Sequence, residues 1–176
     1  LKGIFMTDTN DLDPCVVCTE QQAETIPPIF DGLHQNCPRC GEFEVSGTAL
    51  SLLNQGLGKD KRARLSGWIL GQNRAGAIPM ITSDNLQNIL NRPLPSVSER
   101  ARKLLLEAVH GKSELMVRFQ ISEPRFMAAT YSADTNDLTF LFNLLSNEGF
   151  IENVSSGGSA NISPKGWMKI DEFKTE

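Results

Sequence analysis

The chain has 176 residues, of which 40% are hydrophobic and 22% charged, and its formal net charge is −4. This composition excludes wholesale disorder, and the length suits one ordinary domain or a small module joined to a compact one. No apolar run approaches the roughly 20 residues that span a bilayer, and the first residues lack the apolar core of a signal peptide, so we expect a cytoplasmic protein.

Charge is segregated along the chain. Residues 1–58 hold two basic and eight acidic side chains, a balance of −6. Residues 59–103 have a balance of +6 and residues 104–176 a balance of −4. A partner with negative charge would therefore meet the middle of the chain and not its ends.

Two Cys-x-x-Cys pairs near the N-terminus predict a metal site. The pairs are 18 residues apart and contain all four cysteines, which are Cys15, Cys18, Cys37 and Cys40. Two thiolates held by one tight turn can bind an ion, and a second such turn across a hairpin completes the tetrahedron that zinc prefers. Gly41 supplies the unhindered backbone that such a turn needs. Residues 29–33 are expected to form a strand and turn, and residues 42–46 a strand. The spacing therefore predicts a zinc ribbon over residues 14–55.

Other interpretations of the cysteines stay open. Two disulfides or four unrelated thiols are disfavoured, since disulfides are rare in cytosolic proteins. Iron is the minority alternative to zinc, because a rubredoxin-like site uses the same four thiolates. Four protein ligands leave no open coordination position, which favours a structural ion over a catalytic one. His34 lies three residues before Cys37, and we expect it to be a surface residue of the hairpin.

A mostly helical segment is predicted over residues 56–133. A first helix begins near Asp60 and is stopped by Gly76 and Pro79. The run Thr82-Ser83-Asp84 offers the cap of a second helix, and a third begins near Ser96 or Ser98. Six basic side chains of the first and third helices are candidate phosphate contacts, namely Lys61, Arg62, Arg64, Arg100, Arg102 and Lys103. A solvated helix face is the commoner meaning of such charges, and no aromatic residues are interleaved with them, so we favour that interpretation.

Residues 134–176 predict the C-terminal part of a winged helix-turn-helix. Asp134 caps a helix with an apolar stripe, and Gly149 ends it. A hairpin and a last helix are expected to follow, with strands at 150–154 and 160–162, a turn at 155–159 and the helix start at Ser163-Pro164.

The outer face of the predicted helix suits a protein contact better than DNA. A helix that enters the major groove needs basic or amide side chains and phosphate contacts, and this helix has no Arg or Lys. The turn at 155–159 is uncharged as well. The candidate interaction face consists of Phe140, Asn143, Leu144 and Asn147. We therefore predict a protein partner or self-association and disfavour DNA.

Four short motifs belong to the expected scaffold: Cys15-Val16-Val17-Cys18, Cys37-Pro38-Arg39-Cys40-Gly41, Ile81-Thr82-Ser83-Asp84-Asn85-Leu86 and Ser163-Pro164-Lys165-Gly166-Trp167. With them, the order of ribbon, basic helical segment and winged helix resembles a loosely defined group of prokaryotic modules. These modules lie N-terminal to nucleoside 2-deoxyribosyltransferase-like or TIR-like effector domains. The resemblance spans residues 14–173 and implies no catalytic residues in this chain.

We thus expect an α+β protein with an N-terminal zinc ribbon, a helical segment and a C-terminal winged helix, preceded by a tail at residues 1–13 that is disordered or left over from cloning. No motif of an enzyme active site is present, and neither a membrane nor a small-molecule substrate is indicated. The expected function is a non-catalytic, zinc-binding recognition or adaptor module. The alternatives are a DNA-binding transcriptional regulator that uses residues 59–103 and the N-terminal regulatory part of a larger prokaryotic signalling or defence enzyme.

Overall fold

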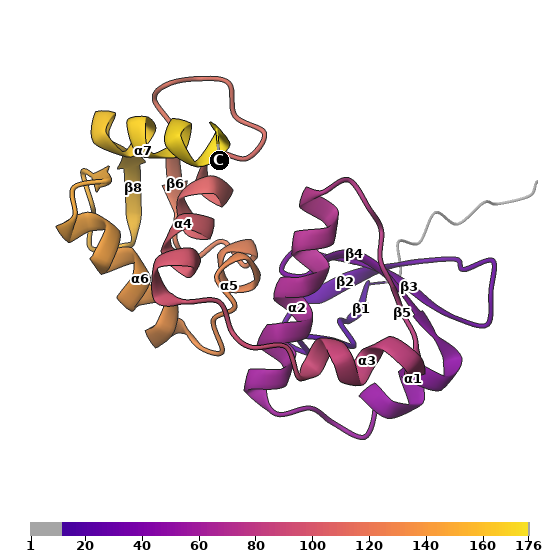
Figure 1. Cartoon of the computed structure of the whole chain (residues 1–176). Helices are drawn as coiled ribbons and strands as arrows, with labels where there is room; N and C mark the ends of the chain where they lie inside the picture. Colours follow the sequence, from indigo (N-terminus) through magenta and orange to yellow (C-terminus); the bar gives the residue numbers. More distant parts are fainter. Residues whose placement is uncertain (1–11, 176) are drawn as a thin grey trace, which may run out of the picture.

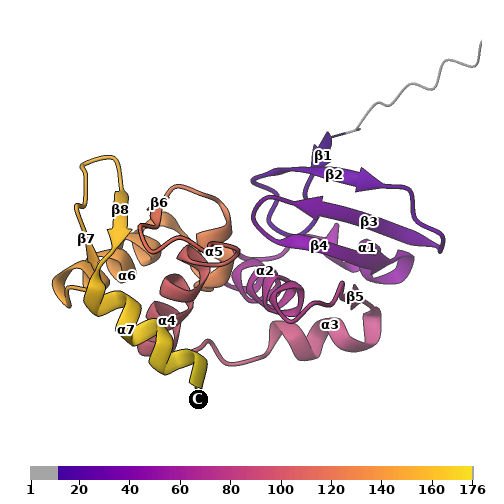
Figure 2. The same ribbon diagram turned by 90° about the horizontal axis from the view of Figure 1, so that it is seen from above.

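The N-terminal half of the protein is a mixed sheet covered by helices. The structure is a computed structural model, and it describes residues 12–175. Its first sheet has five strands in the order β1-β2-β3-β4-β5 (Figures 1 and 2). The strands are β1 (Leu12–Pro14), β2 (Gln22–Ile26), β3 (Gly32–Cys37), β4 (Gly41–Ser46) and β5 (Met80–Ile81). Neighbours are antiparallel except β5, which runs parallel to β4.

Three helices pack in this half: α1 (Gly47–Leu53), α2 (Lys59–Arg74) and α3 (Ser83–Leu90). Helix α1 continues directly from β4, whose last residue Ser46 accepts the amide N–H of Ala49 as the N-cap. Helix α3 begins with a capping box, in which Thr82 and Asn85 each satisfy the other's backbone N–H. Helix α2 lies against β4 and α3 (Figure 2), so the sheet is covered by the helix that also faces the C-terminal half.

The C-terminal half follows the order helix, strand, helix, helix, strand, strand, helix. Its elements are α4 (Val97–Ala108), β6 (Arg118–Gln120), α5 (Arg125–Ala129), α6 (Thr135–Asn147), β7 (Ile151–Glu152), β8 (Ser159–Ile162) and α7 (Pro164–Thr175). The strands form an antiparallel sheet in the order β6-β8-β7 (Figure 2). The expected caps are present, since Asp134 accepts two amide N–H groups of α6 and Ser163 accepts the amide N–H of Gly166.

The buried apolar side chains form two clusters. The first joins the sheet and α1 to α3, and it includes Phe43, Leu65, Ile81 and all four cysteines. The second joins α4 to α7 and the three-stranded sheet, with Phe126 at its centre. The predicted helical segment 56–133 therefore contributes to both clusters, because α2 and α3 pack with the first and α4 with the second.

Several predicted elements differ in extent from the structure. Residues 12 and 13 belong to β1 and not to a tail, while residues 1–11 lie outside the described part. The strand expected at 29–33 begins only at Gly32. The strand expected at 150–154 is shortened to β7, because Asn153 adopts a left-handed backbone with φ of 54°.

The segment expected to be helical also contains the strands β5 and β6. Both are short, and each exists because it pairs with a strand distant in the sequence, β4 for β5 and β8 for β6. Among residues 12–175, no helix combines the length and the apolar character that crossing a membrane would require.

Candidate metal centre

The four cysteines come together at one end of the first sheet. Cys15 and Cys18 lie in the turn between β1 and β2, whereas Cys37 ends β3 and Cys40 immediately precedes β4. All four side chains are buried, and their Sγ atoms lie within 4.8 Å of one another. The pairing of β3 with β4 forms the second turn, and the pairing of β2 with β3, with Glu24 opposite Asn36, places it beside the first. The predicted clustering is confirmed.

The sulfur separations fit a shared ion and not disulfides. The Sγ atoms of Cys15 and Cys40 are 3.8 Å apart, and those of Cys18 and Cys37 are 3.7 Å apart. A disulfide needs about 2.05 Å. A tetrahedron with metal–sulfur bonds of about 2.3 Å has edges of about 3.8 Å, which matches both distances. The four thiols are therefore positioned to hold one metal ion.

Without a bound cation, the surroundings of the cysteine cluster do not favour the thiolate form of all four side chains. Burial raises the pKa of the Cys40 thiol well above its ordinary value. A hydrogen bond with the Cys15 thiol lowers the pKa of the Cys18 thiol. A bound divalent cation would compensate the negative charge of the thiolates and favour their deprotonation.

Two buried polar side chains outside the cysteine motifs support the cluster. Gln35 accepts the amide N–H of Val16 at 3.1 Å and donates to the backbone oxygen of Pro14 at 3.4 Å, which holds the first cysteine turn. Ser66, on α2, lies with its Oγ 3.2 Å from the Cys40 Sγ. Neither residue belongs to a motif that marks it in the sequence. The one local signal for Ser66 was its polar side chain next to Leu65 on the otherwise apolar face of α2.

Replacing Ser66 by alanine is expected to weaken metal binding about 10- to 100-fold, because the buried hydroxyl would donate to the Cys40 sulfur once that sulfur is a metal-bound thiolate. Competition with a chromophoric zinc chelator measures the affinity. Ser51→Ala is the matched control, since the Ser51 hydroxyl lies on the exposed side of α1 and donates only to the backbone oxygen of Gly47. Equal affinities for the two variants would contradict a role for Ser66.

Arg39 connects the cluster to the C-terminal half. It lies within the second cysteine turn and its side chain is only 3% exposed. Its guanidinium donates to the carboxylate of Glu20 and, through Nη2, to the backbone oxygen of Ser132 at 3.3 Å. Ser132 lies just ahead of the α6 N-cap. Displacing the second cysteine turn would therefore remove a hydrogen-bond donor from the backbone that leads into α6.

His34 does not join the cysteine cluster. Its Nε2 lies 2.9 Å from a carboxylate oxygen of Glu42, and its Nδ1 lies 3.9 Å from Glu44, the residue opposite it on β4.

Gly41 has a φ of 88°, and a Cβ there would lie 2.0 Å from the Asn73 side-chain oxygen. The turn after Cys40 thus requires glycine for both reasons.

The basic side chains named as candidate phosphate contacts lie on α2 and α4. On α4, Arg100 donates to the backbone oxygen of Thr130 and to Asp137, while Arg102 and Lys103 pair with Glu99. On α2, Arg62 donates to Thr19, whereas Lys61 and Arg64 line a shallow surface depression with residues 56–60. Four of the six are thus engaged within the described chain.

The candidate interaction face lies on α6. The side chain of Phe140 is 60% exposed, and Asn143 and Asn147 are exposed one and two turns further along the helix. Leu144 is half-buried and packs against the second apolar cluster. The structure thus leaves one large aromatic ring and two amides on the outer side of α6, with Leu144 at their edge.

Comparisons with protein-family models, with curated proteins and with solved structures find no match to this chain.

Proposed function

We propose that the protein is a non-catalytic recognition module, in which a metal-stapled sheet supports a winged helix-turn-helix that binds a protein. The observation that carries this proposal is the exposed Phe140 on the outer face of α6. The order of elements from α4 to α7, with a three-stranded sheet ordered β6-β8-β7, supports the winged helix, with α6 as its recognition helix and β7–β8 as its wing. The resemblance to prokaryotic modules that precede effector domains implies the same arrangement.

The charges around α6 support a protein partner over DNA. The helix contains no Lys or Arg, and the segment between β7 and β8 is uncharged from Asn153 to Gly158. DNA binding depends chiefly on basic side chains that neutralise phosphates. Arg100 of α4 contacts α6, but its guanidinium already pairs with Asp137 of that helix. A DNA-binding role for residues 59–103 therefore has weaker support.

Zinc is the ion that we propose for the cysteine cluster, in a structural role. Four thiolate donors with tetrahedral spacing suit zinc, and they leave no position for a substrate or water. Iron bound to the same thiolates would have a visible charge-transfer absorption, which zinc lacks. Elemental analysis of the purified protein distinguishes the two, and finding neither metal would contradict the proposal.

The Phe140→Asp variant tests the interaction face. An aspartate would place a charge in the centre of an apolar contact, so we expect it to reduce self-association, or binding to a protein partner, at least tenfold. Light scattering after gel filtration measures the oligomeric state over a range of concentrations. Because Phe140 is exposed, the variant is expected to change the melting temperature little.

Ser51→Asp is the control, since Ser51 is exposed on α1, away from α6, and the substitution adds the same charge. It is expected to associate as the wild-type protein does. Tight binding to duplex DNA that weakens steeply with salt, unaffected by Phe140→Asp, would favour the DNA-binding alternative and overturn the proposal.

A further inference from the structure

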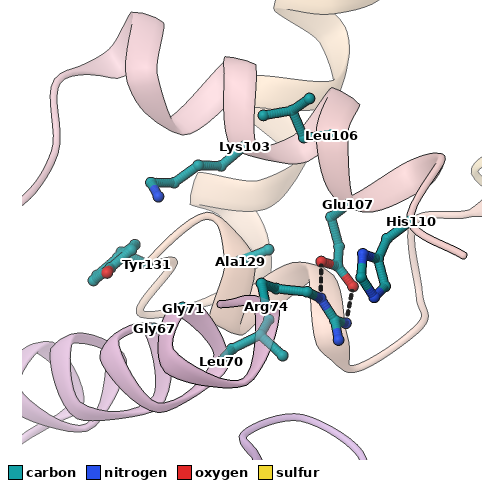
Figure 3. Close-up of a pocket in the computed structure, with 10 residues that line it drawn as sticks. All are labelled: Gly67, Leu70, Gly71, Arg74, Lys103, Leu106, Glu107, His110, Ala129 and Tyr131. Atoms are coloured by element: carbon teal, nitrogen blue, oxygen red, sulfur yellow. Dashed lines mark hydrogen bonds and ion pairs between the residues drawn. The ribbon is translucent and has the colours of Figure 1, made fainter. Parts of the chain in front are cut away.

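A cavity of about 210 Å³ lies between the two halves of the protein, where α2 faces α4 and the end of α5 (Figure 3). It does not involve the cysteines or the exposed face of α6. One wall is a single face of α2, since Gly67, Leu70, Gly71 and Arg74 recur at helical spacing. Residues of α4, with Ala129 and Tyr131, form the opposite wall.

Two glycines form the floor of this cavity, and they differ in what lies above them. A Cβ at Gly67 would lie 2.6 Å from the ring of Tyr131, so that ring rests directly on the α2 backbone. A Cβ at Gly71 would meet nothing within 4 Å. Glycine within a helix is destabilising relative to alanine. Close packing does not explain the glycine at position 71, because no neighbouring atom would meet a Cβ there. The space above Gly71 is the cavity itself.

Tyr131 closes one end of the cavity with a strained backbone. Its φ is 54°, in the left-handed region that a bulky side chain rarely adopts. Such strain persists where the surroundings impose it, and it is common at ligand-binding positions. Here it turns the aromatic ring toward Gly67 and presents an aromatic edge to the cavity (Figure 3).

The side chains that line the cavity carry one net positive charge with His110 counted as neutral, since Arg74 and Lys103 are basic and Glu107 is acidic. Glu107, which is only 4% exposed, accepts hydrogen bonds from Arg74 and from Arg125, so one carboxylate faces two guanidinium groups. Arg74 uses its Nε and Nη2 for this pair, and no hydrogen bond of its Nη1 is found among residues 12–175. Lys103 lies on the Tyr131 side (Figure 3), where its ammonium is 5.9 Å from the ring centre and 3.7 Å from a carboxylate oxygen of Glu99, which does not line the cavity.

These features select the class of ligand. The walls are mostly apolar, with Leu70, Leu106 and Ala129 between the charged ends. A cavity of about 150 Å³ holds benzene, so the space here suits one ring with a small substituent and is too small for a nucleotide. The one net positive charge of the lining favours a negative substituent and disfavours a cation. We propose that this cavity binds a small monocyclic organic acid, with Lys103 and Arg74 as the groups that receive its carboxylate.

Benzoate is the probe for this proposal. In an amide ¹H–¹⁵N NMR titration of the full chain, we expect saturable shifts at Gly67, Gly71 and Ala129, with a dissociation constant of about 1 mM or tighter. Acetate lacks the ring and benzylamine has the opposite charge, so neither is expected to produce these shifts. A benzoate titration without saturable shifts at these amides would overturn the proposal.

Substitutions at Gly71 separate binding from folding. Because a Cβ meets nothing there, Gly71→Ala is expected to raise the melting temperature by about 2–4 °C through helix propensity while it fills part of the cavity. Affinity for benzoate should fall from wild type to Gly71→Ala, and by tenfold or more in Gly71→Leu. Folded Gly71→Leu protein that binds benzoate as wild type does would overturn the proposal.

Lys103→Gln tests the charge. It is expected to weaken benzoate binding several-fold, whereas Lys61→Gln, an equal change of charge at an exposed position of α2 outside the cavity, should leave it unchanged. Equal weakening by both substitutions would show that benzoate responds only to net charge, and the specific site would then be wrong.

Discussion

Replacing Cys15 and Cys40 by serine is expected to unfold the N-terminal half of the chain while the C-terminal half keeps its own buried cluster. The cysteines lie within the first cluster, together with Phe43, Val45 and Leu65. Metal binding supplies about 10–16 kcal/mol in small zinc-dependent folds, which is comparable with the whole stability of an ordinary domain. We therefore expect a loss of about 5 kcal/mol or more in the N-terminal half.

The two tryptophans allow each half to be followed separately. Trp68 packs against the first cluster and Trp167 against the second. In chains that carry Trp167→Phe or Trp68→Phe, the remaining tryptophan reports the thermal transition of one half by fluorescence. The cysteine substitutions should remove the transition seen by Trp68 and shift that of Trp167 much less. An unchanged Trp68 transition would mean that the cluster does not depend on a metal.

Gly166→Ala is expected to destabilise the C-terminal half, although the same substitution stabilises most helices. A Cβ at Gly166 would lie 2.1 Å from the backbone oxygen of Phe150 and 3.1 Å from Ile162 Cγ2. The Phe150 oxygen cannot easily move, because it accepts the amide N–H of Ser163 at 3.0 Å. The Ser163 hydroxyl in turn donates to the backbone oxygen of Gly149.

Overpacking of this kind costs about 3 kcal/mol, which corresponds to a fall of about 6–12 °C in the melting temperature. Thermal unfolding followed by circular dichroism measures the change. Gly71→Ala is the control, because the same substitution on a helix with open space above it is expected to raise the melting temperature. A rise in both variants would show that α7 can move away from Phe150.

Signals that lie within a few residues of sequence were sufficient for much of the fold. The capping side chains Thr82, Ser96 and Asp134 are each placed at the start of a helix, and each accepts a backbone N–H within that helix, so local hydrogen bonding alone marks those boundaries. The spacing of the cysteines likewise predicted their cluster, because the turn before β2 and the turn after its antiparallel neighbour β3 lie at the same end of the sheet.

Short strands and buried polar contacts could not be predicted in this way. The strands β5 and β6 have two and three residues, which is too few for a periodic pattern, and they form because a distant partner strand offers free backbone groups. Ser66 and Arg39 lie 26 and 93 residues from Cys40 and Ser132, their respective partners. Only the packing of α2 and α5 brings such pairs together.

The cysteine cluster separates what the sequence determines from what only the tertiary structure decides. The sequence by itself determined which four residues meet, since a ligand set depends on residue type and on turns that are local. The tertiary structure alone decided what surrounds them: the hydroxyl of Ser66 beside one sulfur, the link from Arg39 to the backbone ahead of α6, and the cavity above Gly71. These features depend on how two separately buried clusters pack against each other, which no local pattern encodes.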